Sequence, residues 1–515
     1  MKSIYKVGII CAIILLPTLF FPISSDISIY ALGGKTIASG GKIYVDYLDL
    51  KPPGLYLAFA ALYKVIGISP LSLRFFDFLM QSLTCALIFL ILDKRFKDRK
   101  SGILAACVYA ALYTALSFSQ TLQAESFVGI GFSLIFILLS GKRTPTKSAL
   151  TGLIAALLFS LKFTFGVVGA AAILYVLLDN QKDIKRSLFE SGYIAFGAII
   201  GALIGFFPLF DPVVFKDFKL ILQYLDYYSS LNGFSYEFVR DSIKSVGEIF
   251  GDKISLLITF ASIIGCALLL KMRLLASEQR RNEILFFFIA AALLFFSIIV
   301  ERKFHYYHFL RLYPIISIFS GIGISYFLPH IKRQFADGNG IDKSITVILL
   351  GIAVVFSPVP RIIGLTIPAA QYFVDYDKYL NFYEKGDGVV IYKTQRAVAS
   401  YLNKAVPEGS LAVVVSTGGG QINYFRQDKP HSKFAQSQFL MGELKIPKWQ
   451  NEFEKELRRA TYIAIQTNDA HPSITGIPDA SYDWIRKSNF WAYIRDHYSE
   501  TKRIGSFVIL QHTAD

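Results

Sequence analysis

The residues of this sequence that could carry chemistry are ionisable side chains at the ends of long apolar segments. An ionisable group at membrane depth is costly unless it is paired or wetted, so each one is a candidate functional residue. Most are cations, which suit an anionic group such as a phosphate, and a carboxylate nearby suits a general base. They are Asp26, Lys51, Arg74, Glu125, Lys162, Arg302, Lys303, His305 and Arg311.

The composition predicts an integral membrane protein. The 515 residues are 53% hydrophobic and 18% charged, and the mean hydropathy is +0.46. This excludes disordered and collagen-like classes. All four cysteines fall in apolar segments, so neither a disulfide framework nor a zinc cluster is predicted. The net charge of +15 does not predict nucleic-acid binding, because the excess of Lys and Arg lies in short loops between apolar segments.

Eleven apolar segments predict about eleven transmembrane helices. The loops on one side hold 20 Lys/Arg in 60 residues, about three times the density of the opposite loops, and such an excess marks the cytoplasmic side. The N-terminus is therefore expected in the cytoplasm as an uncleaved anchor, and an odd number of crossings places the C-terminal region outside. The segments are 7–23, 75–92, 102–118, 125–140, 149–161, 166–178, 188–207, 254–270, 284–300, 309–328 and 344–358.

The fifth and sixth segments are short for a membrane crossing. Each has about 13 residues, which as a helix reach about 20 Å against a hydrocarbon core of about 30 Å. Basic loops flank the pair on both sides. We therefore expect a hairpin of short helices that turns at 162–166, with Lys162 at the floor of a notch in the outer leaflet. A single bent helix is the alternative, and it would place the downstream basic loops outside.

The predicted fold class is an α-helical polytopic membrane protein with a small extracytoplasmic α/β domain. The membrane domain covers 1–358, a linker covers 359–393, and the α/β domain covers 394–515. Within the membrane domain, two extracytoplasmic loops are long, at 24–74 and 208–253.

The first long loop contains two stretches, 26–38 and 53–67, that read as helices lying in the membrane interface. The second is rich in Tyr and Phe, which is typical of an interfacial aromatic belt or of stacking on sugar rings. The α/β domain contains Thr417–Gly420, which we interpret as a tight turn because its spacing matches no phosphate loop. The domain is expected to contain helices over 394–405 and 485–498 and strands over 411–416, 460–466 and 506–511.

Several short motifs occur in a characteristic order along the chain. They are Asp26, Gly40, Tyr44, Lys51-Pro52-Pro53, Leu55-Tyr56, Arg74, Glu125, Ala155-Ala156-Leu157 with Lys162, His305-Tyr306 with Pro314, and Tyr401, Pro407, Val413-Val414-Val415 and Tyr424. Together they resemble the GT-C membrane glycosyltransferases, in the branch of the protein O-mannosyltransferases and the lipid A aminoarabinose transferases. The resemblance spans most of the chain.

The resemblance implies interfacial first-loop helices over a helical bundle, and a polyprenyl-phosphate-linked sugar as donor. Under it, the catalytic residues would be Asp26, as general base, and Glu125, and a single displacement would invert the anomeric centre. The acceptor would be a hydroxyl of a lipid, glycan or protein. Protein mannosyltransferases carry Asp-Glu where this chain has Asp26-Ile27, which disfavours a protein acceptor. The lipid phosphate would be bound by Lys51, Arg74, Lys162, Arg302, Lys303, His305, Tyr306 and Arg311.

Each of these residues also has a structural interpretation. Asp26 could cap the first interfacial helix, and Lys51 could be an interfacial anchor. Lys162 could extend to the lipid headgroups. Arg311 could form an ion pair with a structural role only, and His305 could have its hydrogen bonds satisfied at the membrane interface. Glu125 could be a metal ligand, an acceptor contact or a partner for Arg74. No metal ligand set is predicted, although a divalent cation is possible.

The alternative to a glycosyltransferase is a membrane transporter or a lipid-linked glycan flippase. A non-enzymatic scaffold is a third hypothesis. The odd number of segments and the one-sided placement of ionisable groups disfavour transport. No Asn lies in an N-x-S/T sequon, which favours a bacterial inner membrane. The expected partners are the lipid-linked donor, the acceptor and membrane lipids. The transferred sugar is expected to be a hexose or a pentose.

Overall fold

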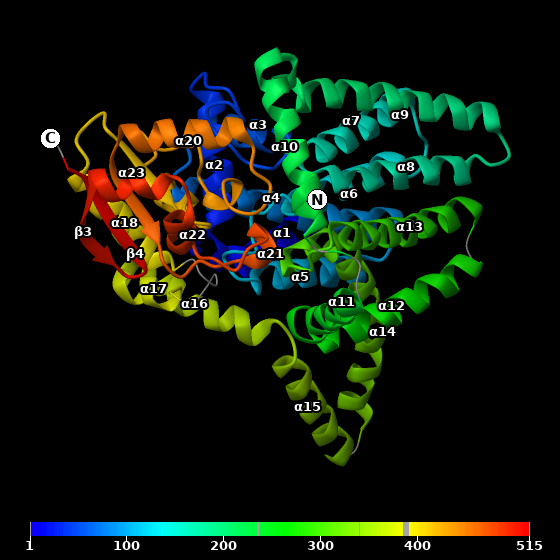
Figure 1. The fold of residues 1–515 in the computed structure, drawn as a ribbon. Coiled ribbons are helices and arrows are strands. Elements are labelled where there is room, and N and C mark those ends of the chain that lie inside the picture. Colours follow the sequence, from blue (N-terminus) through cyan, green and yellow to red (C-terminus); the bar gives the residue numbers. More distant parts are fainter. Residues whose placement is uncertain are drawn as a thin grey trace. The chain divides into compact units, whose positions relative to one another are not determined.

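The computed structural model describes residues 2–231, 233, 236–275, 277–338, 340–384 and 391–513 (Figure 1). They pack into two compact units, each assembled from three segments of the chain. Unit 1 consists of Met1–Phe21, Leu71–Gly205 and Ser235–Tyr372, and unit 2 consists of Pro22–Pro70, Phe206–Phe234 and Phe373–Asp515. The domain boundaries placed after residues 358 and 393 follow the order of the chain and stay a prediction.

Unit 1 is built of helices, as expected for apolar runs that must satisfy their backbone groups internally. Each of the eleven apolar segments coincides with a helix, whereas α11 and α16 lie in regions expected to be loop and linker. The helices are α1 Lys2–Leu15, α4 Pro70–Leu90, α5 Arg99–Thr114, α6 Ser126–Leu139, α7 Pro145–Leu161, α8 Gly166–Asp179, α9 Ile184–Gly205, α11 Tyr236–Glu248, α12 Leu256–Leu275, α13 Glu278–Glu301, α14 Tyr313–Asp337, α15 Gly340–Val355 and α16 Val359–Val374.

The helix lengths leave the number of membrane crossings open. Six helical stretches of the described chain are long and apolar enough to cross a membrane, and the pair α15 and α16, bent by 52°, would make a seventh. Helices α6, α7 and α8 are apolar but have only 14, 17 and 14 residues. The helical character of the predicted segments is confirmed, but the count of eleven crossings is not.

The expected hairpin at residues 162–166 is confirmed. Helix α7 ends at Leu161, a short 3₁₀ turn follows, and α8 returns beside α7 (Figure 1). At the open end of the hairpin, the Arg143 guanidinium lies 2.6 Å from a carboxylate oxygen of Asp179 at the end of α8. It also lies 2.6 Å from Glu190 of α9. These ion pairs tie the start of α7 to its two neighbours.

Helices α7 and α9 approach each other closely at glycines. A Cβ atom added at Gly197 of α9 would lie 1.7 Å from the carbonyl oxygen of Ala149, and one added at Gly152 of α7 would lie 1.8 Å from that of Ile194. A side chain at either position would therefore force the two backbones apart. Small residues are the usual means of such close contact between membrane helices.

Replacing Gly197 with Ala is expected to lower the free energy of unfolding by about 2 kcal/mol, because the cost of overpacking exceeds the gain in helix propensity. The matched control is Gly192→Ala in the same helix, where an added Cβ meets nothing within 4 Å. This control should be neutral or stabilising. Thermal unfolding of the purified protein in detergent measures both variants, and equal effects would contradict the close-packing interpretation.

Unit 2 contains the α/β region expected at the C-terminal end. Its four-stranded sheet has the order β1-β2-β4-β3, with β1 parallel to β2 and β4 antiparallel to both its neighbours. The predicted strands are confirmed as β1 Leu411–Val415, β2 Ala460–Gln466 and β4 Phe507–His512. The strand β3 Tyr498–Ile504 was not expected, because five of its seven residues are exposed and polar or charged.

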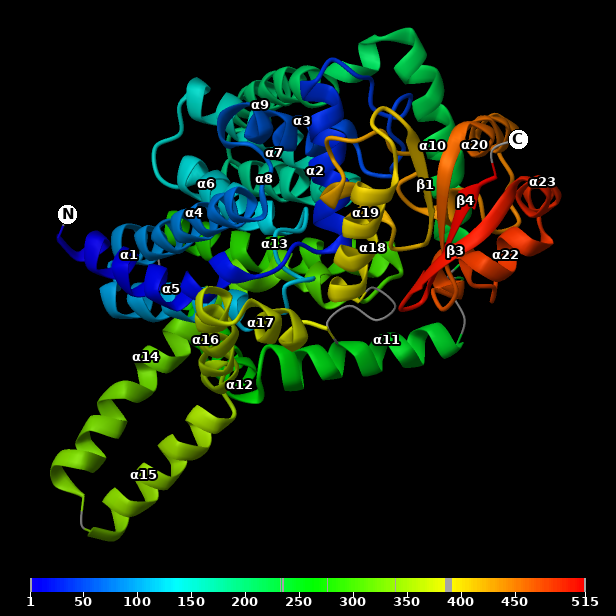
Figure 2. The ribbon, with the colours of Figure 1, turned by 90° about the vertical axis from the view of Figure 1, so that its left-hand side faces the viewer.

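Helices cover both faces of this sheet (Figure 2). On one face, Val398 of α18 and Ile422 of α19 pack with Val414 and Ile509 of the sheet. On the other, Phe453 of α20 forms ring contacts with the Trp484 and Phe490 side chains. The predicted helix over 485–498 is instead two helices that break at Ser488. The helices are α17 Tyr376–Phe382, α18 Tyr392–Ala405, α19 Gly420–Phe425, α20 Pro447–Arg459, α21 Pro472–Thr475, α22 Ser481–Lys487 and α23 Phe490–His497.

Both helices expected in the first long loop are present in unit 2, as α2 Ser25–Ala38 and α3 Pro53–Ile66. They touch the C-terminal part of the same unit: the Gln421 side-chain amide donates to the Ile23 carbonyl at 2.5 Å, and the Tyr424 hydroxyl donates to the Ile68 carbonyl. The sequence Thr417–Gly420 turns the chain from β1 into α19, as expected.

The aromatic-rich second loop contains α10 Pro212–Ser230 as well as α11. Tyr224 of α10 is buried in unit 2, where its ring packs against Phe439 and Trp449 with centroids 5.5 and 5.8 Å apart. Its hydroxyl donates to the Gln438 carbonyl at 2.8 Å. Tyr224 is therefore part of a core rather than of a belt or a sugar-stacking surface.

Candidate functional site

A cluster of charged side chains lies where four helices of unit 1 begin or end. Glu125 immediately precedes α6, Lys162 immediately follows α7, and Glu301 is the last residue of α13. Arg311 lies in the 3₁₀ segment Tyr306–Leu312 that leads into α14. The prediction that distant ionisable residues meet at helix ends is thus fulfilled for Glu125, Lys162 and Arg311.

The cluster is held together by four short ion pairs. The Lys162 Nζ lies 2.6 Å from an oxygen of Glu125 and 2.7 Å from one of Glu301. The Arg311 Nη2 lies 2.9 Å from the same Glu125 oxygen and 2.8 Å from the other Glu301 oxygen. Each cation therefore bridges both carboxylates. Charge-assisted contacts of this kind are stronger than neutral hydrogen bonds.

Neutral polar groups complete the shell around these charges. The Thr164 hydroxyl donates to Glu301, and Arg311 donates to the Ser297 hydroxyl at 2.8 Å. The His308 Nε2 lies 3.3 Å from Glu301, while its Nδ1 contacts the Lys303 carbonyl. Because that carbonyl can only accept, Nδ1 carries a proton, while Nε2 faces the carboxylate of Glu301.

The cluster is charge-balanced and mostly removed from solvent. The side chains of Arg311 and Glu125 are 0% and 2% exposed, whereas those of Glu301 and Lys162 are 10% and 13% exposed. Two carboxylates face two cations, so removal of any one member would leave a buried charge without its counterpart. The residual exposure is confined to Lys162 and Glu301, which are the two members a ligand could reach.

The backbone around the cluster adopts conformations that side-chain-bearing residues rarely take. Arg302, directly after α13, has φ of 53°, and Leu122, three residues before Glu125, has φ of 57°. Both lie in the left-handed region, which disfavours residues with a Cβ atom. Such positions concentrate at functional sites, where the surrounding structure holds them in place.

The carboxylates of Glu125 and Glu301 and the ring of His308 are also the one group in the described chain whose ligand atoms, within 4.8 Å of one another, could hold a metal ion. The donor types suit a divalent cation. However, Lys162 and Arg311 already donate to the same carboxylate oxygens. A divalent ion there would lie beside two positive charges, so the geometry favours an ion-paired cluster over a metal centre.

Arg74 serves a different purpose from the cluster. Its side chain is fully buried in unit 1, where it donates to the carbonyls of Phe21 and Phe118, each at 3.1 Å, and to the Thr121 hydroxyl at 2.9 Å. Its ion-pair partner is Asp77, 3.8 Å away, and Glu125 pairs with other cations. These contacts favour a role in joining the first segment to α4 over contact with a lipid phosphate.

The segment between Glu301 and His308 carries four more predicted phosphate-binding residues. Arg302, Lys303 and Tyr306 are partly buried and His305 is exposed. The rings of His305 and His308 lie 5.5 Å apart. This segment is therefore the accessible rim beside the buried cluster.

Asp26 lies in the first turn of α2, in unit 2, and is partly exposed. The helix is capped by the preceding Ser24, whose hydroxyl oxygen accepts from the Ile27 amide at 3.3 Å. The structural interpretation in which Asp26 is the N-cap is therefore wrong. A carboxylate in the first turn is also favourable to the helix dipole, but that role does not require this particular position.

Lys51 belongs to a tightly hydrogen-bonded loop of the same unit. The Tyr44 hydroxyl donates to the Lys51 carbonyl at 2.6 Å, and the Tyr56 hydroxyl donates to the buried carboxylate of Asp49. Burial raises the pKa of Asp49; the charge of Lys51 and the Tyr56 hydrogen bond oppose this, while the negative charge of Asp26 adds to it. Asp26, Asp49 and Lys51 thus share one electrostatic neighbourhood.

The residues that sequence reasoning overlooked are Glu301, His308 and Asp49. Glu301 ends an apolar segment, and this position alone could have marked it as a candidate. It was overlooked because two cations, Arg302 and Lys303, follow it directly. Positions 26 and 51 lie in unit 2 and position 162 lies in unit 1, so a single site that contains all three stays a prediction.

Part of the chain matches a known protein family. A family model described as dolichyl-phosphate-mannose-protein mannosyltransferase matches residues 50–210, a range that includes Lys51, Arg74, Glu125 and Lys162. No curated protein sequence matches the chain.

Solved structures share the fold at 12% sequence identity. ArnT from Cupriavidus metallidurans bound to undecaprenyl phosphate aligns with a TM-score of 0.61 over 100% of this chain and 98% of that one. The archaeal oligosaccharyltransferase AglB from Archaeoglobus fulgidus, in complex with an inhibitory peptide and a dolichol-phosphate, gives 0.52 over 96% and 72%. The A. fulgidus oligosaccharyltransferase tethered to an acceptor peptide gives 0.51 over 99% and 74%. The predicted resemblance to GT-C glycosyltransferases is confirmed for the fold and by the family match over residues 50–210, and the apolar helices support an integral membrane protein.

Proposed function

We propose that this protein transfers a sugar from a polyprenyl-phosphate-linked donor to an acceptor hydroxyl on the extracytoplasmic side of a bacterial inner membrane. The observation that carries the proposal is the mannosyltransferase family match over residues 50–210, because that range contains Lys51, Glu125 and Lys162. The solved relatives with a polyprenyl phosphate, ArnT and AglB, support a lipid-linked donor. The predicted orientation and domain boundaries belong to this proposal.

The proposed reaction is a single displacement. The acceptor oxygen forms a bond to the anomeric carbon while the bond from that carbon to the phosphate oxygen breaks, and the electron pair leaves with the phosphate. The acceptor proton goes to Asp26, and the anomeric configuration inverts. A carboxylate also stabilises the positive charge that develops on the sugar ring in the transition state.

Asp26 suits the role of base because its carboxylate is partly exposed and the helix cap is made by Ser24. In unit 2, Lys51 is the cation in the same neighbourhood. Asp49 is buried and hydrogen-bonded by Tyr56, so it orients the loop that carries Lys51 rather than meeting a substrate.

In unit 1, the phosphate leaving group is expected to interact with cations at the accessible edge of the cluster. Lys162 is partly exposed and has three donor hydrogens, two of which are used by Glu125 and Glu301. Arg302 and Lys303 on the rim are partly exposed as well. Fixed cations that meet charge as it develops on a leaving group are a major source of rate enhancement. Glu125, as a buried partner of Lys162, positions this cation.

The proposal is tested by incubating the purified protein with a panel of polyprenyl-phosphate-linked hexoses and pentoses and a membrane extract as acceptor source. We expect at least one donor to release polyprenyl phosphate and to yield a glycosylated product of inverted anomeric configuration, as read by NMR. Nucleotide sugars serve as the control and should give no product.

Two results would contradict the proposal. One is that the protein releases polyprenyl phosphate from none of the donors, although a cooperative thermal unfolding transition shows that it is folded. The other is movement of a lipid-linked glycan across proteoliposomes without formation of a new glycosidic bond, which would favour the flippase alternative.

A further inference from the structure

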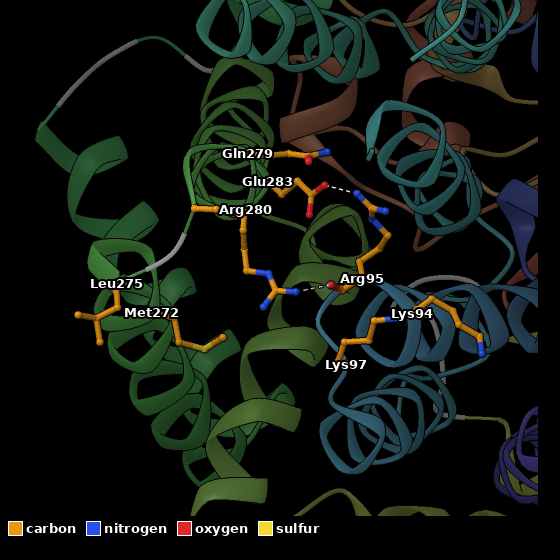
Figure 3. A pocket seen from close by; sticks show the side chains of 9 residues that line it. Lys94, Arg95, Lys97, Met272, Leu275, Gln279, Arg280 and Glu283 are labelled. Atoms are coloured by element: carbon orange, nitrogen blue, oxygen red, sulfur yellow. Dashed lines mark hydrogen bonds and ion pairs between the residues drawn. The ribbon is translucent and has the colours of Figure 1, made fainter. Parts of the chain in front are cut away.

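A second charged site lies in unit 1, at the end of the bundle where α4 ends and α13 begins. There, a cleft of about 610 Å³ is lined by side chains of the helical turn Ile91–Arg95 that continues α4, of Lys97, and of the junction between α12 and α13 (Figure 3). Its ionisable residues are Lys94, Arg95, Lys97, Arg280 and Glu283. Lys94 is ion-paired with Asp93 and Arg95 with Glu283, so the positive charge of the cleft comes from Lys97 and Arg280.

The cleft is formed by specific contacts rather than by loose surface chains. Arg95 is ion-paired with Glu283, and Arg280 donates to the Arg95 backbone carbonyl at 3.0 Å (Figure 3). Lys97 has φ of 58°, a left-handed backbone conformation that is rare for a residue with a side chain. Among the described residues, Lys97 forms no ion pair, so its charge is available to a ligand.

One wall of the same cleft is apolar. Met272 and Leu275, near the end of α12, line it, and their side chains are 37% and 81% exposed. A small hydrated anion would gain nothing from this wall. A ligand with an anionic head and an apolar chain would use both the cations and the exposed apolar surface.

The cleft is remote from the cluster described above. Arg280 and Glu301 lie at opposite ends of α13, and 21 residues of helix separate them by about 32 Å. This distance matches a hydrocarbon core of about 30 Å. The lining residues also belong to 93–101 and 271–283, the stretches between predicted crossings that the charge distribution is expected to place on the cytoplasmic side.

We propose that this cleft binds the phosphate group of an anionic membrane lipid, with an acyl chain of that lipid against Met272 and Leu275. The proposal does not depend on the proposed transfer reaction, because none of these residues belongs to the cluster at Glu301. Lipid and inorganic phosphate share the chemistry that Lys97 and Arg280 recognise, and the apolar wall favours the lipid.

The test is thermal unfolding of the detergent-purified protein titrated with phosphatidylglycerol, phosphatidylcholine or inorganic phosphate, together with native mass spectrometry of retained lipid. Phosphatidylglycerol is expected to raise the unfolding temperature saturably. In the Lys97→Gln/Arg280→Gln variant, its apparent affinity should fall about 25-fold, since each basic group near an anionic lipid is worth about fivefold.

The matched control is Lys185→Gln/Arg281→Gln, which removes two exposed cations of unit 1 outside the cleft and should change the affinity less than about twofold. A second variant, Lys94→Gln/Lys97→Gln, keeps the test valid if loss of Arg280 unfolds the protein. Equal loss of affinity in the control overturns the site. Saturable protection by inorganic phosphate to the same extent, or by phosphatidylcholine, overturns the assignment of an anionic lipid.

Discussion

Replacement of Asp26 with Asn is expected to lower the rate of sugar transfer by about 10²–10⁴-fold, the usual worth of a general base. Asn has nearly the same shape but cannot accept the proton of the acceptor hydroxyl. Because Ser24 makes the N-cap contact of α2, the substitution should cost at most about 1 kcal/mol of stability through the helix dipole. Release of polyprenyl phosphate and thermal unfolding, measured on the same preparation, separate the two effects.

The matched control is Asp46→Asn, an exposed carboxylate of the same first loop, which should retain activity within about threefold. Binding of the donor lipid should persist in the Asp26→Asn variant, since the change leaves the proposed phosphate-binding cations in place. If this variant kept more than about a tenth of the wild-type rate, Asp26 would not be the base.

The second large effect is expected from Arg311→Met, which should lower the free energy of unfolding by about 3–5 kcal/mol. Arg311 is fully buried and bridges Glu125 and Glu301. Its removal leaves two buried carboxylates against Lys162 alone, so one negative charge is uncompensated. Denaturant or thermal unfolding in detergent measures this loss, and Arg281→Met, an exposed position of α13, is the control.

A double-mutant cycle distinguishes lost charge balance from lost packing. In Arg311→Met/Glu301→Gln, the remaining Lys162 and Glu125 are again balanced, 2.6 Å apart. This double variant should be more stable than the sum of the single effects predicts, by roughly 1–3 kcal/mol. Additive effects would mean that the cluster is held by shape rather than by charge.

The helices of this protein could be predicted from the sequence because their apolar runs are long and sharply bounded. Even the hairpin at Lys162 followed from the short segments and the basic loops on both sides. Several elements were missed, among them α11, α16 and β3. Helix α16 contains Pro368 in its interior, which argues against a helix in the sequence, and strand β3 is an exposed edge strand with polar side chains.

The candidate site was predicted only in part, because pairing depends on which helix ends meet. The sequence pointed to Glu125, Lys162 and Arg311 as costly charges, but not to their direct contact. It favoured His305 over His308, although His308 is the one within 3.3 Å of Glu301. Glu301 itself was hidden beside two cations, and a count of charges cannot tell a carboxylate that neutralises a cluster from one at a surface.

Unit 2 is assembled from three chain segments that are synthesised at different times. Residues Pro22–Pro70 leave the ribosome early, but the segment that completes their unit, Phe373–Asp515, follows about 300 residues later. At about 5–20 residues per second, α2 and α3 wait roughly 15–60 s before Gln421 and Tyr424 can bond to Ile23 and Ile68. During translation, helix α2, which carries Asp26, therefore remains without these contacts, and unit 2 is completed only after its last strands are made.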